Sequence, residues 1–120
     1  MLYNRQWGKS SQNQVQVILH RAANLVRKRG LAKGMQLDYN GSVCVHGAIS
    51  IAATGKPYKD RSPAICNAER YVYNYLKSIG VDERIISPNG LAGWNNCDSR
   101  TAEEVIEALE GAAALACCEA

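Results

Sequence analysis

The strongest folding signal in the chain is a helix start at residues 101–104 that leads into an apolar stripe. Thr101 and Glu104 have the spacing of a capping box, in which each side chain accepts a hydrogen bond from the other residue's backbone N–H. Glu103 and Glu104 also place carboxylates in the first turn, where the helix dipole favours negative charge. The stripe has helical spacing and consists of Val105, Ile106, Leu109, Ala112, Ala113 and Ala116. The sequence therefore predicts a helix over residues 101–116 that buries one face.

The turn before this helix carries a large indole surrounded by polar side chains. Burying Trp94 would remove on the order of 200 Å² from water, so we expect it to pack beneath the last helix. Two interpretations of its neighbours stay open: a structured loop whose amides bond the backbone, or a polar binding site. We name these residues the Trp94 loop, which consists of Trp94, Asn95, Asn96, Asp98 and Arg100.

Two earlier stretches show the same helical pattern. Residues 11–29 end in three cations followed by Gly30, which suits a left-handed helix cap. Residues 63–79 start with Pro63 after a Ser62 cap, an order typical of helix N-termini. The first apolar stripe is Val15, Ile18, Leu19, Ala22, Leu25 and Val26, and the second is Ile65, Ala68, Val72, Tyr75, Leu76 and Ile79.

Between these helices the apolar period changes from helical spacing to alternation. Residues 35–45 alternate apolar and polar side chains around Asn40-Gly41, a pair that readily forms the type I′ turn of a β-hairpin. The small apolar residues that follow predict a short buried helix over 46–54. The expected fold class is α+β, mainly α, with about four helices near 11–29, 46–54, 63–79 and 101–116 packed around this small hairpin.

The 120 residues predict a single domain, since a chain of this length buries about two thirds of its unfolded surface. No linker or repeat divides it. We expect residues 1–14 to form an N-terminal arm and residues 15–116 to form the core.

The five cysteines are odd in number and contain no C-x-x-C pair, so neither a disulfide framework nor a zinc ribbon is indicated. Free thiols fit a reducing compartment. The chain has neither the charge and apolar order of a secretion signal nor a run of ~20 apolar residues. We therefore expect a cytoplasmic protein, off the membrane, with no metal or other cofactor.

Cys44 and His46 form a candidate secondary site, because residues two apart on a strand share one face. A nucleophile and its base also need an orienting group and an oxyanion site, and the sequence shows neither. The alternative is that Cys44 is an inert buried cysteine and His46 a hydrogen-bonded histidine beside it. We therefore assign no catalytic residues, and enzymatic activity stays uncertain.

A net charge of +3 is too small to indicate nucleic-acid binding unless the cations are concentrated. The one candidate basic patch is Arg21, Arg27, Lys28, Arg29 and Lys33. Such clusters commonly serve the C-terminus of their own helix, and no nucleic-acid-binding motif accompanies this one.

The order of these features resembles a family of small uncharacterised proteins from actinobacteria and their phages. The resemblance runs from about Val15 to Ala116 and is most specific in Cys44 with Gly47-Ala48, and in Trp94-Asn95 followed by Arg100-Thr101 and Glu104-Val105. In that family an Asp usually follows Trp-Asn, where this chain has Asn96. The resemblance implies a domain of unknown function and carries no activity.

The leading hypothesis is a non-enzymatic accessory protein, phage-encoded or actinobacterial, that binds a host factor, an assembly component or another copy of itself. Its support is that capping, turns and core packing explain every strong signal, while Trp7 and several tyrosines offer aromatic surface. One alternative is a small-molecule binder or minor enzyme that uses Asn95, Asn96, Asp98 and Arg100. The other is nucleic-acid binding through the basic patch.

Overall fold

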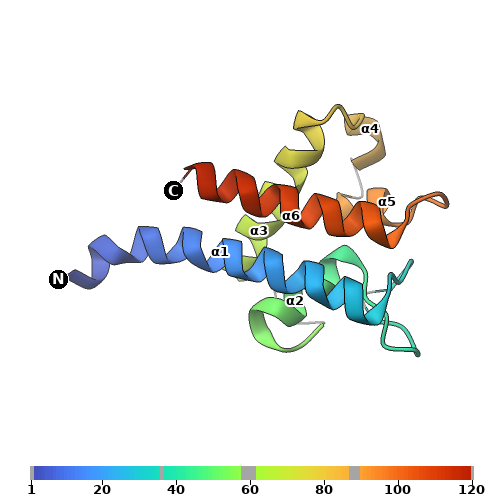
Figure 1. Ribbon diagram of the computed structural model, residues 1–120, viewed down its shortest axis with the longest axis horizontal. Coiled ribbons are helices and arrows are strands. Elements are labelled where there is room, and N and C mark those ends of the chain that lie inside the picture. Colours follow the sequence, from blue (N-terminus) through green and yellow to red (C-terminus); the bar gives the residue numbers. More distant parts are fainter. Residues whose placement is uncertain (1, 36, 58–61, 87–89, 120) are drawn as a thin grey trace.

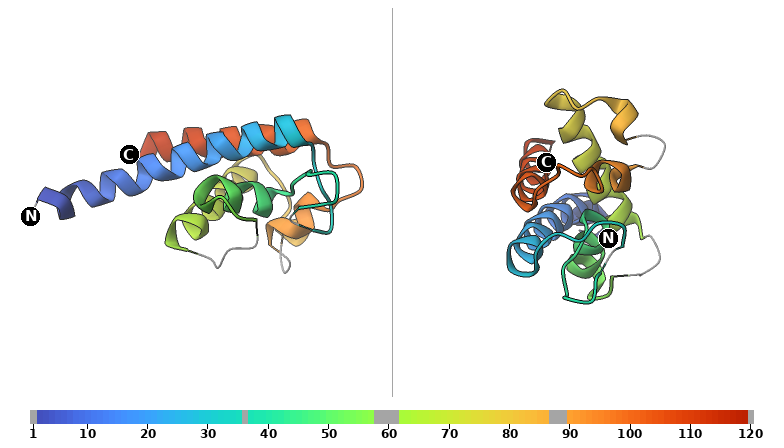
Figure 2. Two further views of the ribbon diagram at one scale, coloured as in Figure 1. Left: turned by 90° about the horizontal axis from the view of Figure 1, so that it is seen from below. Right: turned by 90° about the vertical axis from the view of Figure 1, so that its right-hand side faces the viewer.

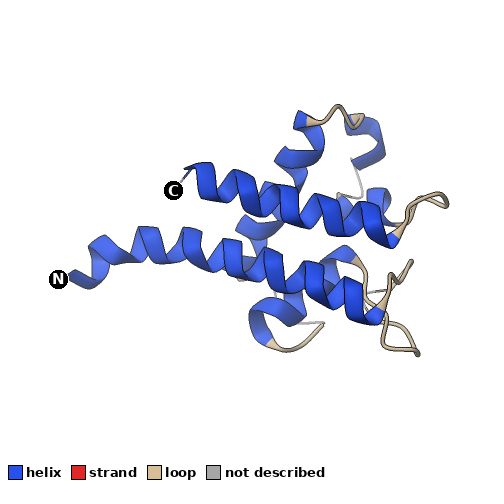
Figure 3. Cartoon of the chain, in the orientation of Figure 1, coloured by secondary structure: helices blue, strands red, loops and turns tan. Residues whose placement is uncertain are grey.

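The computed structural model describes residues 2–35, 37–57, 62–86 and 90–119, and their side chains over residues 14–117 with the same gaps. The described residues form helices and connecting loops and contain no β-strand (Figure 3). In chain order the helices are α1 (Leu2–Arg29), α2 (Val45–Thr54), α3 (Pro63–Ser78), α4 (Glu83–Ile86), α5 (Leu91–Asn95) and α6 (Ala102–Glu119).

The two longest helices, α1 and α6, pack side by side in antiparallel orientation, and α1 extends past the end of α6 (Figure 1). Small buried residues face each other along this contact, which lets the two backbones approach closely. They include Ala22 and Ala23 on α1 and Ala112, Ala113 and Ala116 on α6.

The helices α2, α3 and α5 lie on one side of the α1–α6 pair, so the fold has two helical layers (Figure 2, left). The core fills the space between these layers. Its largest fully buried apolar side chains are Leu19, Ile49, Leu76, Ile86 and Leu109, and Trp94 on α5 joins the same cluster.

The expected α+β class is wrong, because residues 35–45 do not form a hairpin of two strands. Val43 makes only isolated bridges, antiparallel to Leu37 and parallel to Leu31. Its N–H donates to the Gly30 carbonyl at 3.0 Å, and its own carbonyl accepts from the Ala32 N–H at 2.9 Å. The backbone of the expected second strand is therefore bonded to the segment that leaves α1.

The turn at Asn40-Gly41 also differs from the expected type I′ turn. Gly41 has a φ of 85°, but no described non-glycine residue has a positive φ, so Asn40 lacks the left-handed conformation that type I′ requires. The Asp38 carboxylate accepts hydrogen bonds from the N–H groups of Asn40 and Ser42, both at 2.9 Å. This side-chain cap closes the turn, and beyond it the pairing among the described residues is limited to the single antiparallel bridge between Leu37 and Val43.

The four predicted helices are confirmed, with shifted ends. The first begins at Leu2, so the residues expected to form an arm are helical from that point. The last runs from Ala102 to Glu119 and extends beyond residue 116. The short helix α5 was not predicted, and it places Trp94 and Asn95 on a helix in place of a turn.

Within the described residues, no helix combines the length and the apolar character needed to span a membrane.

Candidate functional site

Arg100 and Trp94 connect α5 to the start of α6. The Arg100 guanidinium lies over the Trp94 ring, 4.3 Å from its centroid, and Nε donates to the Trp94 carbonyl at 3.0 Å. Nη1 also forms an ion pair with Glu104 on the first turn of α6 at 3.4 Å. The Arg100 side chain is 13% exposed, so it is largely committed to this contact.

Asn95 is completely buried and joins three segments of the chain. Its Oδ1 accepts from the Val45 N–H at 2.9 Å, and its Nδ2 donates to the Ala32 carbonyl at 2.9 Å. Val45 is the first residue of α2, where a backbone N–H has no partner within the helix. Asn95 therefore supplies a hydrogen-bond acceptor to the N-terminus of α2 and a donor to the segment that follows α1.

The other polar residues of the Trp94 loop also bond to that loop after α1. The Asn96 Oδ1 accepts from the Gly34 N–H at 2.8 Å. Lys33 Nζ donates to the carbonyls of Cys97 at 2.7 Å and Asp98 at 2.9 Å. The Trp94 loop and residues 31–34 are thus held together by side-chain to backbone hydrogen bonds.

Of the Trp94 loop, Trp94 and Arg100 line a small pocket between α3 and α6, together with residues that include Tyr75 and Ile79. Its volume is about 120 Å³. Pockets that bind drug-sized ligands are typically about 300–1,000 Å³. This pocket has room for a few atoms, and its described lining does not include Asn95, Asn96 or Asp98.

The second predicted site places Cys44 at the N-cap of α2. The Cys44 Sγ accepts from the Gly47 N–H at 3.3 Å. Burial raises the pKa of the Cys44 thiol, and the nearby Glu69 carboxylate adds to that effect. The thiol is therefore protonated at neutral pH, which is the opposite of what a cysteine nucleophile needs.

His46 lies in the first turn of α2, where its Nδ1 bonds the Glu69 carboxylate of α3. The Glu69 side chain is 8% exposed, so the histidine supplies a partner to a buried carboxylate. Glu69 was not predicted from the sequence as a site residue, although it stands next to the apolar stripe of its helix. The contact ties α2 to α3.

The residues of the basic patch have different surroundings, and Arg29 is exposed at the end of α1. Arg27 donates to Glu110 of α6 and to Asn24, each at 2.6 Å. Lys33 is committed to the carbonyls of the Trp94 loop. Arg21 and Lys28 lie at a groove between α1 and α2. Within the described residues, no three His, Cys, Asp or Glu side chains gather to form a metal site.

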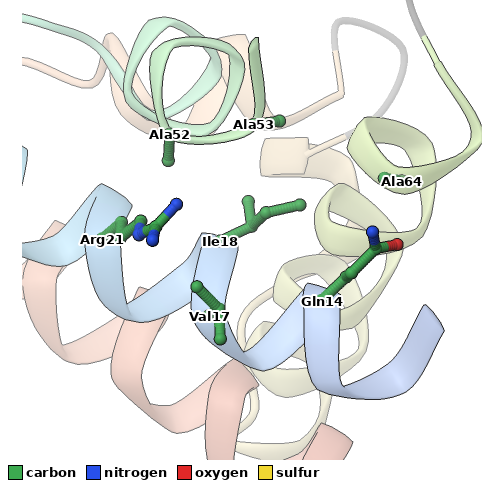
Figure 4. Close-up of a pocket in the computed structure, with 7 residues that line it drawn as sticks. All are labelled: Gln14, Val17, Ile18, Arg21, Ala52, Ala53 and Ala64. Carbon is green, nitrogen blue, oxygen red and sulfur yellow. The ribbon is translucent and has the colours of Figure 1, made fainter. Parts of the chain in front are cut away.

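This groove is the main feature that the sequence did not reveal. Its first part has a volume of about 460 Å³ and is lined by Gln14, Val17, Ile18, Arg21, Ala52, Ala53 and Ala64. Figure 4 shows Gln14, Ile18 and Arg21 on α1 below Ala52 and Ala53 of α2, with Ala64 of α3 beside them. Val17 is 45% exposed, so it presents apolar surface to this part of the groove.

The groove continues along α1 into a second part of about 360 Å³, lined by Arg21, Asn24, Leu25, Lys28, Ile51 and Ala52. Arg21 and Ala52 line both parts, so the two parts adjoin at these residues. The described lining contains no carboxylate, and within the described residues neither Arg21 nor Lys28 forms an ion pair. We call this surface, formed by all of these lining residues, the α1–α2 groove.

The tyrosines that the structure describes lie outside the α1–α2 groove. The side chain of Trp7 is outside the described side chains, as is that of Cys118. On α3, Tyr71 is buried while Tyr73 and Tyr75 are partly buried. Tyr39 is fully exposed at the turn that follows α1.

Comparison with known proteins places the chain in a family without assigning it an activity. Comparisons with curated proteins and with solved structures give no significant match. A family model does match, over residues 10–115, and its description is a family of unknown function. The expected uncharacterised domain is confirmed, whereas its actinobacterial or phage source stays a prediction. The chain belongs to the family of unknown function DUF6197.

Proposed function

We propose that this protein is a non-enzymatic, cytoplasmic accessory protein that binds another protein through the α1–α2 groove. The observation that carries the proposal is an apolar groove whose two cations have no ion-pair partner within the described residues. The partner is a host factor or an assembly component if the source is a phage or an actinobacterium. The unpaired cysteines, which include Cys44, Cys66 and Cys97, support a reducing compartment.

The physical argument is the free energy gained when the groove is covered. Val17 and the partly exposed Leu25, Ile51 and Ala52 present apolar surface to water. Each Å² of apolar surface removed from water contributes about 25 cal/mol to association, before the entropy of binding is subtracted. Contiguous apolar surface of this kind typically marks a protein interaction site.

Two alternative functions have less support. Ligand binding at the Trp94 loop would need Asn95 and Asn96, whose side-chain amides already bond backbone groups. Nucleic-acid binding would use the basic patch of Arg21, Arg27, Lys28, Arg29 and Lys33. Two of these five cations, Arg27 and Lys33, already bond Glu110 and two loop carbonyls. If nucleic acid were the partner, affinity would fall steeply with salt.

The test is affinity capture from cells of the natural source, with wild type compared with Ala52→Arg. Ala52 lines both parts of the groove, so an arginine there fills it. Asn74→Arg, at an exposed position of α3 outside the groove, is the matched control because it adds the same charge. We expect a specific protein with wild type and Asn74→Arg and its loss with Ala52→Arg. Equal recovery from all three, or no specific protein from any, would refute the proposal.

A further inference from the structure

We infer that the α1–α2 groove receives an amphipathic helix of a partner protein that carries carboxylates two helical turns apart. This inference rests on the proposed function and adds the secondary structure and charge of the occupant. Its three supports are the length of the groove, the spacing of its cations and the small size of the residues on α2 and α3.

The length and walls of the groove suit a helix. Its lining extends along α1 from Gln14 to Lys28, which corresponds to roughly 21 Å at the rise of an α-helix. A partner helix of about four turns has that length. Addition of a β-strand would need a sheet edge with free backbone groups, whereas the groove is lined by residues of helices, which bond their own backbones.

The cations define the charge of the occupant. Arg21 and Lys28 are seven residues apart on α1, so they lie on the same side of the helix at a spacing of about 10 Å. Carboxylates at positions i and i+7 of a partner helix have the same spacing and would face these two cations when the helices lie alongside each other. Since the described lining lacks carboxylates, an acidic occupant meets no opposing charge of its own sign there.

The opposite wall leaves room for large apolar side chains. Ala52 and Ala53 on α2 and Ala64 on α3 line the groove with methyl groups only (Figure 4). Leucine-sized anchors at i, i+3 or i+4, and i+7 of an amphipathic helix could occupy this space. The carboxylates and the anchors together define an acidic amphipathic helix.

A second copy of this chain does not supply such a helix from its described residues. The exposed face of α6 carries Glu103 and Glu107, but none of the large apolar residues that are exposed lies on α6. Those residues are Val17, Met35, Tyr39, Ile79 and Ile85. Among the described residues nothing favours a second copy, so the occupant that we propose is a different protein, and self-association is an outcome that the test can detect.

The test uses two designed 16-residue helical peptides as probes. Both carry the same leucine face, and they differ only in having Glu or Lys at positions i and i+7 beside it. Binding to the full chain is measured by fluorescence anisotropy, with sedimentation of the protein alone to detect a dimer. We expect the Glu peptide to bind at least about tenfold more tightly than the Lys peptide, with the difference reduced by high salt.

Charge reversal at the cations provides the decisive variant. Arg21→Glu/Lys28→Glu should reverse the peptide preference, while Ala52→Arg should abolish binding of both peptides. If the reversed variant fails to fold, as judged by circular dichroism, Arg21→Gln/Lys28→Gln should remove the preference without reversing it. Asn74→Arg should leave both affinities unchanged.

Each failure has a distinct meaning. Equal binding of the two peptides to wild type, or a concentration-dependent dimer that blocks the groove, would overturn the acidic-helix inference. If neither peptide binds but Ala52→Arg still abolishes capture of a cellular protein, the acidic-helix inference would also be overturned. The proposed function would remain supported in that case. Loss of both peptide binding and groove-dependent capture would overturn the inference and the proposed function together.

Discussion

Asn95 is a polar residue that the sequence suggests as a binding residue, but in the structure it is part of the core. It is fully buried, and its amide bonds the Val45 N–H and the Ala32 carbonyl. Asn95→Ala would leave both backbone groups buried without that partner, so we expect the free energy of unfolding to fall by about 2–4 kcal/mol. Urea unfolding measures this change. Asn74→Ala, at an exposed position, should change stability by less than about 0.5 kcal/mol.

The opposite outcome at Asn95 would point to a binding role. If Asn95→Ala were as stable as wild type, the buried amide would not be needed for folding, and the interpretation of the Trp94 loop as a structural lock would be wrong. The residue would then be a candidate for contact with a ligand.

The cysteines differ in reactivity for reasons that are local to each. Burial raises the pKa of the Cys44 thiol, whereas hydrogen bonding from Ser99 lowers the pKa of Cys97. Because the thiolate is the reactive form, iodoacetamide at neutral pH should modify Cys97 well before Cys44. Mass spectrometry of the alkylated peptides follows both sites in one sample. Rapid labelling of Cys44 in the folded protein would contradict this prediction and would make Cys44 a candidate nucleophile again.

At the scale of helices, local helix propensity and tertiary packing have opposite effects on stability at Gly111. Alanine in a helix is favoured over glycine by about 1 kcal/mol. A Cβ at Gly111, however, would lie 2.2 Å from Cε1 of Tyr75 on α3. Overpacking of this kind costs about 1–3 kcal/mol, so we expect Gly111→Ala to destabilise the protein.

A double mutant tests that explanation of Gly111. In a Tyr75→Ala background the ring is absent, and Gly111→Ala should then stabilise the helix by up to about 1 kcal/mol. Denaturant unfolding of the four proteins completes the cycle. A stabilising effect in both backgrounds would show that α3 and α6 are not packed as closely as described.

The capping box of α6 makes stability depend on pH. The Thr101 N–H donates to the Glu104 carboxylate, and this bond lowers the pKa of Glu104 from its ordinary value of 4.5. A carboxylate with a lowered folded pKa stabilises the protein above its unfolded pKa and loses that effect as the pH falls through the folded pKa. Wild type should therefore lose stability below about pH 4.5.

Glu104→Gln is the control for this pH dependence, because it keeps an oxygen that can accept the Thr101 bond but cannot be protonated in that range. Thermal unfolding between pH 6 and 3 should show a shallower decline for the variant than for wild type. Parallel curves would mean that Glu104 does not contribute to the acid sensitivity.

Local signals explain which elements could be predicted. The caps and stripes of α3 and α6 lie within their own sequences, so these helices follow from nearest neighbours alone. The segment around Val43 has an equally clear alternation, but its backbone bonds Gly30 and Ala32, and alternation cannot identify a distant partner. The predicted hairpin failed for that reason.

At the scale of the whole molecule, the candidate site depends on how helices are placed relative to one another. The sequence predicted Trp94 and Arg100 as candidate site residues, and in the structure Arg100 lies over the Trp94 ring of α5. The α1–α2 groove could not be found from sequence, because Val17 and Ala52 are 35 positions apart and have no distinguishing pattern. Only the packing of α2 against α1 brings them together.

The Trp94 loop and the α1–α2 groove therefore have different roles. Hydrogen bonds hold the Trp94 loop to residues 31–34, while the α1–α2 groove carries Arg21 and Lys28 without ion-pair partners among the described residues. Residues that hold the fold affect stability, and residues that contact a partner affect binding.

The most direct measurement is site-specific photo-cross-linking in cells of the natural source. A photoreactive amino acid is placed in the groove at Val17 in one protein and on the Trp94 loop at the exposed Asp98 in another. We expect a discrete cross-linked protein from position 17 and none from position 98. Adding Ala52→Arg should abolish the cross-link from position 17. A cross-linked protein from position 98 that persists with Ala52→Arg, with none from position 17, would contradict this expectation.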